Sequence, residues 1–115
     1  MRRKGIALLL AALMMYAGCA VADDWAETQW TREQARQRNM TLISEAQARS
    51  IAARQFGDRK PLRFKEIELE NEADDYPDGT DFRPVYKLEC RLDVTEYDVD
   101  IDAVTGQVLK FKVDD

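Results

Sequence analysis

The chain has 115 residues, of which 45% are apolar and 34% charged, and this length gives room for one small domain. Its net charge of −5 is unsuited to nucleic acids and anionic membranes, whose phosphates need a basic surface. It contains no histidine, which excludes Ser-His and Cys-His nucleophile activation and histidine-ligated zinc, and it lacks a glycine-rich phosphate loop. We therefore expect a non-catalytic protein without a cofactor.

Residues 1–22 have the layout of a signal peptide. A basic start, Met1 to Lys4, precedes an apolar run from Ile6 to Met15 and a small-residue cleavage site at Ala20–Ala22. The apolar run is too short to span a bilayer, so no membrane span is expected. The leader carries three basic and no acidic residues, so its removal would change the net charge from −5 to −8. These features predict export to the periplasm or the medium.

A second interpretation of the leader stays open. The string Tyr16-Ala17-Gly18-Cys19 is similar to the lipobox of bacterial lipoproteins, although an aliphatic residue is usual at the first position. Under this alternative Cys19 is lipidated, becomes the new N-terminus and anchors the protein in the cell envelope. The other cysteine, Cys90, is predicted to face inward on a strand, so we expect no disulfide between the two.

Residues 23–40 are predicted to form a polar linker or arm. Good helix formers after Thr31 favour a short helix there, but the segment has no apolar stripe to bury. Trp25 and Trp30 are its only large apolar residues before Met40. Either they anchor a partner, or one packs on the edge of the domain and the other is incidental.

Residues 41–115 are predicted to form the folded domain, which opens with a helix. Ser44 and Gln47 have the spacing of a capping box, and Gly57 supplies a C-terminal stop. The apolar residues at helical spacing are Ala48, Ile51, Ala52 and Phe56. Because alanines dominate this stripe, the helix is expected to lie close against a sheet.

Two strands are predicted after the helix. The first, residues 64–70, carries glutamates on its outer side and is expected at an edge of the sheet, where a partner strand could add. The second, residues 85–92, has alternating apolar residues on one face. A connection through residues 93–96 would set Leu92 opposite Tyr97. This register predicts that Cys90 faces Val99 and that Leu88 faces Ile101.

Between these strands, residues 71–83 form an acidic loop around a Tyr-Pro-Asp-Gly turn signal. Its carboxylates superficially resemble a cation loop but lack the twelve-residue EF-hand spacing, so they are only weak metal candidates: Asp74, Asp75, Asp78 and Asp81. The loop also supplies the partner-binding candidates Tyr76, Asp78 and Phe82.

Residues 97–113 alternate strictly and predict a β-hairpin around a three-residue loop, Val104–Gly106. The expected pairs are Ile101 with Leu109, Val99 with Phe111, and Tyr97 with Val113. On the other face, a cross-strand charge ladder is expected rather than a metal site. It would place Asp98 between Arg91 and Lys112, Asp100 beside Lys110 and Glu89, and Asp102 beside Lys87. We also expect Asp102 to bond to backbone amides of the turn.

The string Tyr-x-Val-x-Ile-Asp-Ala-x-Thr-Gly-x-Val-Leu within this hairpin, together with the preceding helix and strand, resembles the C-terminal half of a PepSY domain over residues 42–113. The resemblance implies an α+β fold, with one N-terminal helix packed on a three- to four-stranded antiparallel meander sheet. PepSY modules occur in propeptides of thermolysin-like metallopeptidases and in small secreted bacterial proteins. The implied function is an exported protein-binding module that regulates or inhibits a peptidase in trans. The alternative is a cation-binding or structural envelope protein with an acidic loop.

Overall fold

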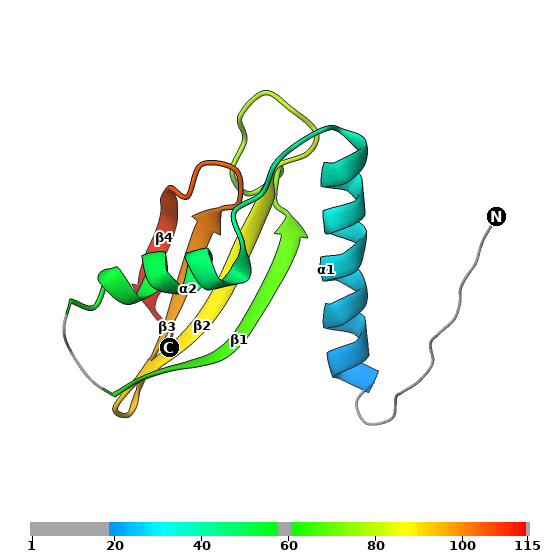
Figure 1. The fold of residues 1–115 in the computed structure, drawn as a ribbon. Helices are drawn as coiled ribbons and strands as arrows, with labels where there is room; N and C mark the ends of the chain where they lie inside the picture. The colour runs from blue at the N-terminus through cyan, green and yellow to red at the C-terminus, as the bar shows by residue number, and fades with distance from the viewer. Residues whose placement is uncertain (1–18, 58–60, 115) are drawn as a thin grey trace.

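The computed structural model describes residues 19–57 and 61–114, and this part of the chain forms two helices and one sheet (Figure 1). The elements are α1 (Cys19–Gln37), α2 (Glu45–Arg54), β1 (Leu62–Asn71), β2 (Pro84–Leu92), β3 (Thr95–Asp102) and β4 (Val108–Val113). All neighbouring strands are antiparallel and lie in the order β1-β2-β3-β4. The predicted α+β fold with a helix preceding a meander sheet is confirmed.

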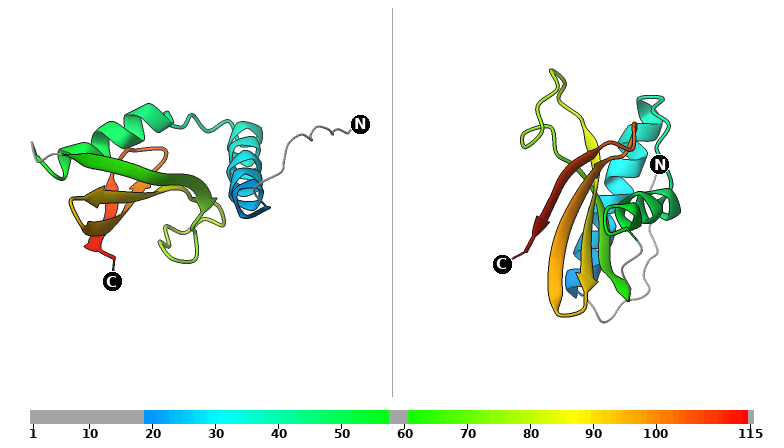
Figure 2. Two further views of the ribbon diagram at one scale, coloured as in Figure 1. Left: turned by 90° about the horizontal axis from the view of Figure 1, so that it is seen from below. Right: turned by 90° about the vertical axis from the view of Figure 1, so that its left-hand side faces the viewer.

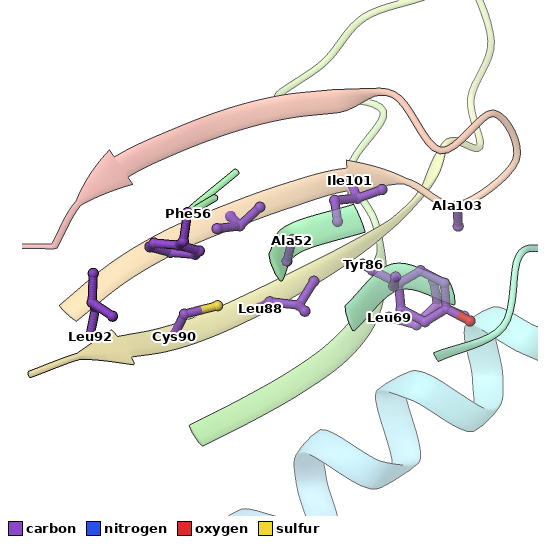
Figure 3. Close-up of a cluster of buried hydrophobic side chains, with 11 residues drawn as sticks. Ala52, Phe56, Leu69, Tyr86, Leu88, Cys90, Leu92, Ile101 and Ala103 are labelled. Carbon is purple, nitrogen blue, oxygen red and sulfur yellow. The ribbon is translucent and has the colours of Figure 1, made fainter. Parts of the chain in front are cut away.

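Helix α2 crosses one face of the sheet, which we call the inner face (Figures 1 and 2). Ser44 caps the helix through the predicted capping box with Gln47. The alanines on its buried side are fully enclosed, so its backbone lies close to the strands, as expected. The buried apolar side chains at this contact, most of them drawn in Figure 3, are Ala48, Ala52, Phe56, Leu69, Tyr86, Leu88, Cys90, Leu92, Val99, Ile101 and Ala103.

The connection between β2 and β3 is tighter than the sequence predicts. Only Asp93 and Val94 separate the strands, and Asp93 takes a φ of 58°, which aspartate tolerates better than a β-branched residue. Leu92 therefore pairs with Thr95 and not with Tyr97. The predicted register is wrong by two residues, yet every side chain stays on its expected face because the strand period is also two.

The hairpin of β3 and β4 follows the predicted register at its open end. The pairs Tyr97 with Val113 and Val99 with Phe111 are confirmed. A β-bulge between Asp100 and Ile101 then shifts the pairing, so Ile101 faces Val108 rather than Leu109. In the longer turn, Gly106 takes a φ of 81°, and Asp102 accepts hydrogen bonds from the turn amides of Val104 and Thr105, as predicted.

Helix α1 departs most from expectation, because the segment predicted as a polar arm is helical and packs along β1 (Figure 1). The side chains that it buries are small: Thr28, Thr31 and Ala35. The sequence therefore shows no apolar stripe on the buried side of this helix. The hydroxyl of Thr28 accepts a hydrogen bond of 3.1 Å from the backbone N–H of Leu69 in β1. Arg32 donates to the Tyr86 hydroxyl at 3.2 Å. The segment thus packs on the sheet although, as the sequence indicates, it has no apolar stripe.

Trp25 and Trp30 are 64% and 52% exposed, so neither is packed away on the domain edge. The lipidation candidate Cys19 is the first residue of α1, and its side chain lies outside the described part of the chain, as do residues 1–18 of the predicted signal peptide. Within the described residues, no helix has both the length and the apolar character needed to cross a membrane.

Candidate functional site

Neither helix covers the face of the sheet opposite α2, which we call the open face (Figure 2). Side chains of all four strands line a shallow hollow of about 210 Å³ at its centre. Five carboxylates and two lysines line it: Glu66, Glu68, Glu89, Asp98, Asp100, Lys87 and Lys110. The open face thus presents a charged, acidic hollow to solvent.

Asp100 lies at the centre of the open face and is only 2% exposed. A buried carboxylate is tolerated only when it is paired. Here the hydroxyl of Tyr76 donates to it at 2.7 Å, the ammonium of Lys110 lies 3.8 Å away, and Lys87 is its register partner on β2. Burial, followed by the hydrogen bond to Asp100, raises the pKa of Tyr76 above its ordinary value. Tyr76 therefore remains a proton donor and fixes the acidic loop to the sheet.

Glu72 begins the acidic loop and is also buried. Its carboxylate lies 3.6 Å from the ammonium of Lys87. Burial raises the pKa of Glu72 to about 8, the neighbouring carboxyls of Asp75 and Glu70 add to the rise, and Lys87 only partly opposes it. Near neutral pH this side chain consequently holds a proton, which lowers the negative charge at the loop's base.

Arg83 closes the acidic loop and clamps it to the end of β3. The Nε and Nη2 atoms of its guanidinium each lie 3.1 Å from the carboxylate of Asp102. The same guanidinium also donates a hydrogen bond of 2.9 Å to the backbone carbonyl of Tyr76. Burial alone would raise the pKa of Asp102, but the backbone N–H groups of Thr105 and Val104 together with Arg83 hold it below its ordinary value. The loop is thus held to the sheet by the hydrogen bond from Tyr76 to Asp100 and by the ion pair of Arg83 with Asp102.

The predicted charge ladder exists in altered form, since the β2–β3 register differs. The observed partners across β2 are Glu89 for Asp98, Lys87 for Asp100 and Val85 for Asp102. Asp98 is therefore not beside Arg91, and its favourable register partner is Lys112 on β4. Asp102 is not beside Lys87, because the register sets it opposite Val85, and its ion-pair partner is Arg83.

Among the four aspartates proposed as weak metal candidates, no three have carboxylate oxygens within 4.8 Å of one another. Asp78 accepts hydrogen bonds from the backbone and hydroxyl of Thr80, while Asp81 pairs with Arg38 at 3.4 Å. Asp74 and Asp75 are exposed. Among residues 19–57 and 61–114, the one group of three carboxylates whose oxygens lie within 4.8 Å of one another is instead Glu89, Asp98 and Asp114, at the far end of the open face.

Of the three partner-binding candidates, two serve the fold of the loop. Phe82 is 5% exposed. The guanidinium carbon of Arg38 lies over its ring, 4.6 Å from the ring centroid. Tyr76 is held by Asp100. Asp78 alone is exposed at the loop's tip. The sequence located the loop, but it carried no signal that Glu72, Arg83 and Lys87 would converge beneath it.

The two edges of the sheet differ. Helix α1 lies along the edge of β1, where Thr28 satisfies a strand N–H. β4, at the other edge, makes extensive contacts only with β3 within the described residues, and its Phe111 and Val113 are 39% and 47% exposed. The edge that the sequence predicts as available is thus covered, and the opposite one is open.

Cys90 is fully enclosed in the core, as predicted from its strand position. Burial raises the pKa of its thiol to about 11, and the nearby carboxylates of Asp98 and Glu89 add to the rise. Since the thiolate is the nucleophilic form, this cysteine is unsuited to catalysis.

Comparison with protein families gives one match over most of the chain. Residues 42–112 match the model described as PepSY, the "Peptidase propeptide and YPEB domain". No curated protein and no solved structure is significantly similar to the chain. The matched region runs from just before α2 into β4 and therefore contains every residue that lines the hollow of the open face.

Proposed function

Because the chain belongs to the PepSY family, we propose that it is an exported, non-catalytic module that binds another protein and thereby restrains a peptidase in trans. The family is peptidase-propeptide-like, which supports the class of partner. The 115 residues contain no histidine and carry no peptidase motif, so the proposed role is to restrain a peptidase and not to cleave peptides.

The observation that carries the proposal is the open face. Its central groups, Asp100, Lys87 and Lys110, are held in place by neighbours on the loop and the strands before any partner arrives. Preorganised side chains lose little entropy on binding, so a polar surface of this kind can bind productively. Carboxylates outnumber lysines around the hollow, which suits a partner that brings basic side chains over β1.

The test uses the protein in the processed form recovered from producing cells. It is added in increasing amounts to the peptidase activity of the native envelope fraction, and the initial rate of peptide cleavage is measured. We expect the rate to fall with saturation as the protein is added. An unchanged rate, with a known inhibitor confirming that the assay responds, would refute restraint of a peptidase.

Two matched variants localise the effect. Glu66→Lys reverses an exposed charge at the hollow, and Glu27→Lys makes the same change on the exposed side of α1. Only Glu66→Lys should weaken the inhibition, by roughly tenfold for one lost charge-assisted contact. An equal loss in both variants would indicate that net charge, and not the open face, governs binding.

A further inference from the structure

We propose that the free edge of β4 is where the partner adds an extended segment to the sheet as a fifth strand, and that this segment alternates acidic with apolar residues. The inference rests on the proposed function, because it names the place and the chemistry by which the partner binds. It depends on three features of β4: its unpaired backbone, its exposed apolar side chains and its lysines.

The backbone of β4 presents hydrogen-bonding groups to solvent. The N–H of Asp114 donates to the carbonyl of Glu96 at 2.8 Å, which fixes the phase of the β3–β4 ladder. In an antiparallel ladder the direction alternates, so Lys112 and Lys110 also bond toward β3, while Val113 and Phe111 direct their N–H and C=O groups away from the sheet. This is the template that strand addition requires.

Apolar contacts for an added strand lie along the same edge. The ring of Phe111 stacks on Tyr97 with centroids 5.6 Å apart and meets Phe56 edge-on at 5.2 Å, so it is held firmly although 39% exposed. Val113 is 47% exposed beside it. Apolar residues of a fifth strand that faced the inner side would extend this aromatic surface.

Lys110 and Lys112 favour acidic residues at alternate positions of the added segment. Both alternate with Phe111 and therefore lie on the open-face side of β4, where a directly opposite residue of an added strand would meet them. Lys110 already lies 3.8 Å from Asp100, and Lys112 is exposed. Acidic residues in the added strand would complete this row of alternating charge.

The same lysines argue against a second copy of this chain as the occupant. If two copies of β4 paired antiparallel with Phe111 opposite either Phe111 or Val113 of the second copy, a lysine would stand directly opposite a lysine. Like charges directly opposite each other on a sheet are destabilising. Lysines at a free edge therefore discourage self-pairing and favour an acidic segment.

A suitable probe is a fluorescent peptide with the sequence of this chain's own β3, Thr95–Asp102, because it already has the alternation that pairs with β4. Its binding to the processed protein is followed by anisotropy. We expect saturable binding, at least tenfold weaker for a peptide in which lysines replace the three aspartates. Absence of binding at millimolar peptide, or equal binding of both peptides, would overturn the proposal.

Val113→Pro removes one outward N–H without removing a bond to β3, and Val113→Thr is the control that keeps this donor and a β-branched side chain. We expect about tenfold weaker peptide binding for the proline variant and about twofold or less for the threonine variant. Thermal unfolding of both variants verifies that the sheet is intact. Equal affinities in two folded variants would contradict strand addition.

The peptidase assay separates this inference from the proposed function. If wild type slows the peptidase and Val113→Pro slows it equally, restraint stands and the β4 edge is refuted as the partner's site. If the peptide binds with the expected pattern but no peptidase is slowed, the edge site stands and restraint fails. Sedimentation of wild type alone shows self-association; a dimer that Val113→Pro dissolves would identify a second copy as the occupant and overturn the proposal.

Discussion

The inner face of the sheet is filled by fully buried apolar side chains such as Tyr86, Val99 and Ile101, whereas the open face is filled by charged ones such as Lys87 and Asp100. Burying apolar surface stabilises a fold directly. Burying charges costs desolvation free energy that their ion pairs return only in part. The contrast indicates that the inner face supplies stability, and it agrees with the binding role that we propose for the open face.

The largest expected effect tests the inner face. Ile101 is fully buried beneath α2, so Ile101→Ala removes apolar contacts and leaves a cavity. We expect a loss of about 3 kcal/mol in the free energy of unfolding, measured with urea. Val94→Ala, at a residue that is 84% exposed, is the control and should change it by less than about 0.5 kcal/mol. If both variants lost a similar free energy of unfolding, the inner face would not be the main source of stability.

A smaller effect is expected when polarity is introduced into the same core. Cys90 is fully enclosed on β2, and Cys90→Ser keeps its approximate size while adding a hydroxyl. The expected destabilisation is about 1–2 kcal/mol in urea unfolding. Comparison with Cys90→Ala separates the cost of the hydroxyl from the loss of the sulfur. If serine were no worse than alanine, the hydroxyl would have found a partner, and the inner face would be less apolar than described.

The inner face could be predicted from the sequence, because apolar residues alternate along β2, β3 and β4 and side-chain facing survives an error of two residues in register. The predicted pairing of Leu92 with Tyr97 was wrong because the connection has only two residues. Of these two, only Asp93 takes a positive φ, so the β-branched Val94 does not prevent a turn this short. The shift at Ile101 arises from a bulge, which alternation alone does not reveal.

The arrangement around the open face was largely hidden. Helix α1 buries Thr28, Thr31 and Ala35, a stripe without large apolar residues, so hydrophobic periodicity missed its packing. The acidic loop was located by its turn residues. Its anchors were not predicted, because Phe82 contacts Arg38 just after α1 and Arg83 contacts Asp102 at the end of β3, both distant in sequence.

A pH-dependent effect tests the buried charges of the open face. Below its ordinary pKa of 4.5, Glu72 is protonated in both folded and unfolded chains. Between 4.5 and about 8 the unfolded chain loses this proton and the folded chain keeps it, so stability falls as the pH rises through that window. Glu72→Gln removes the titration. We expect it to become more stable than wild type by roughly 1 kcal/mol at pH 8, with the difference absent at pH 4.

Thermal unfolding across this pH range provides the measurement, and Glu27→Gln on α1 controls for the loss of one surface carboxylate. If Glu72→Gln and wild type follow parallel curves, Glu72 does not carry a buried proton. The open face would then be solvated like an ordinary surface, and its contrast with the inner face would be weaker than the structure indicates.

The smallest effect concerns two carboxylates that lie opposite each other on the open face. Glu66 on β1 pairs in register with Glu89 on β2, and burial, followed by the charge of Glu66, raises the pKa of Glu89. Glu66→Gln should lower the pKa of Glu89 toward its ordinary value in an NMR titration and stabilise the fold by a few tenths of a kcal/mol. A gain in stability accompanied by weaker inhibition of the peptidase would show that this repulsion is retained for binding. If stability fell instead, Glu66 would be a structural residue, and the open face would share the role that we assign to the inner one.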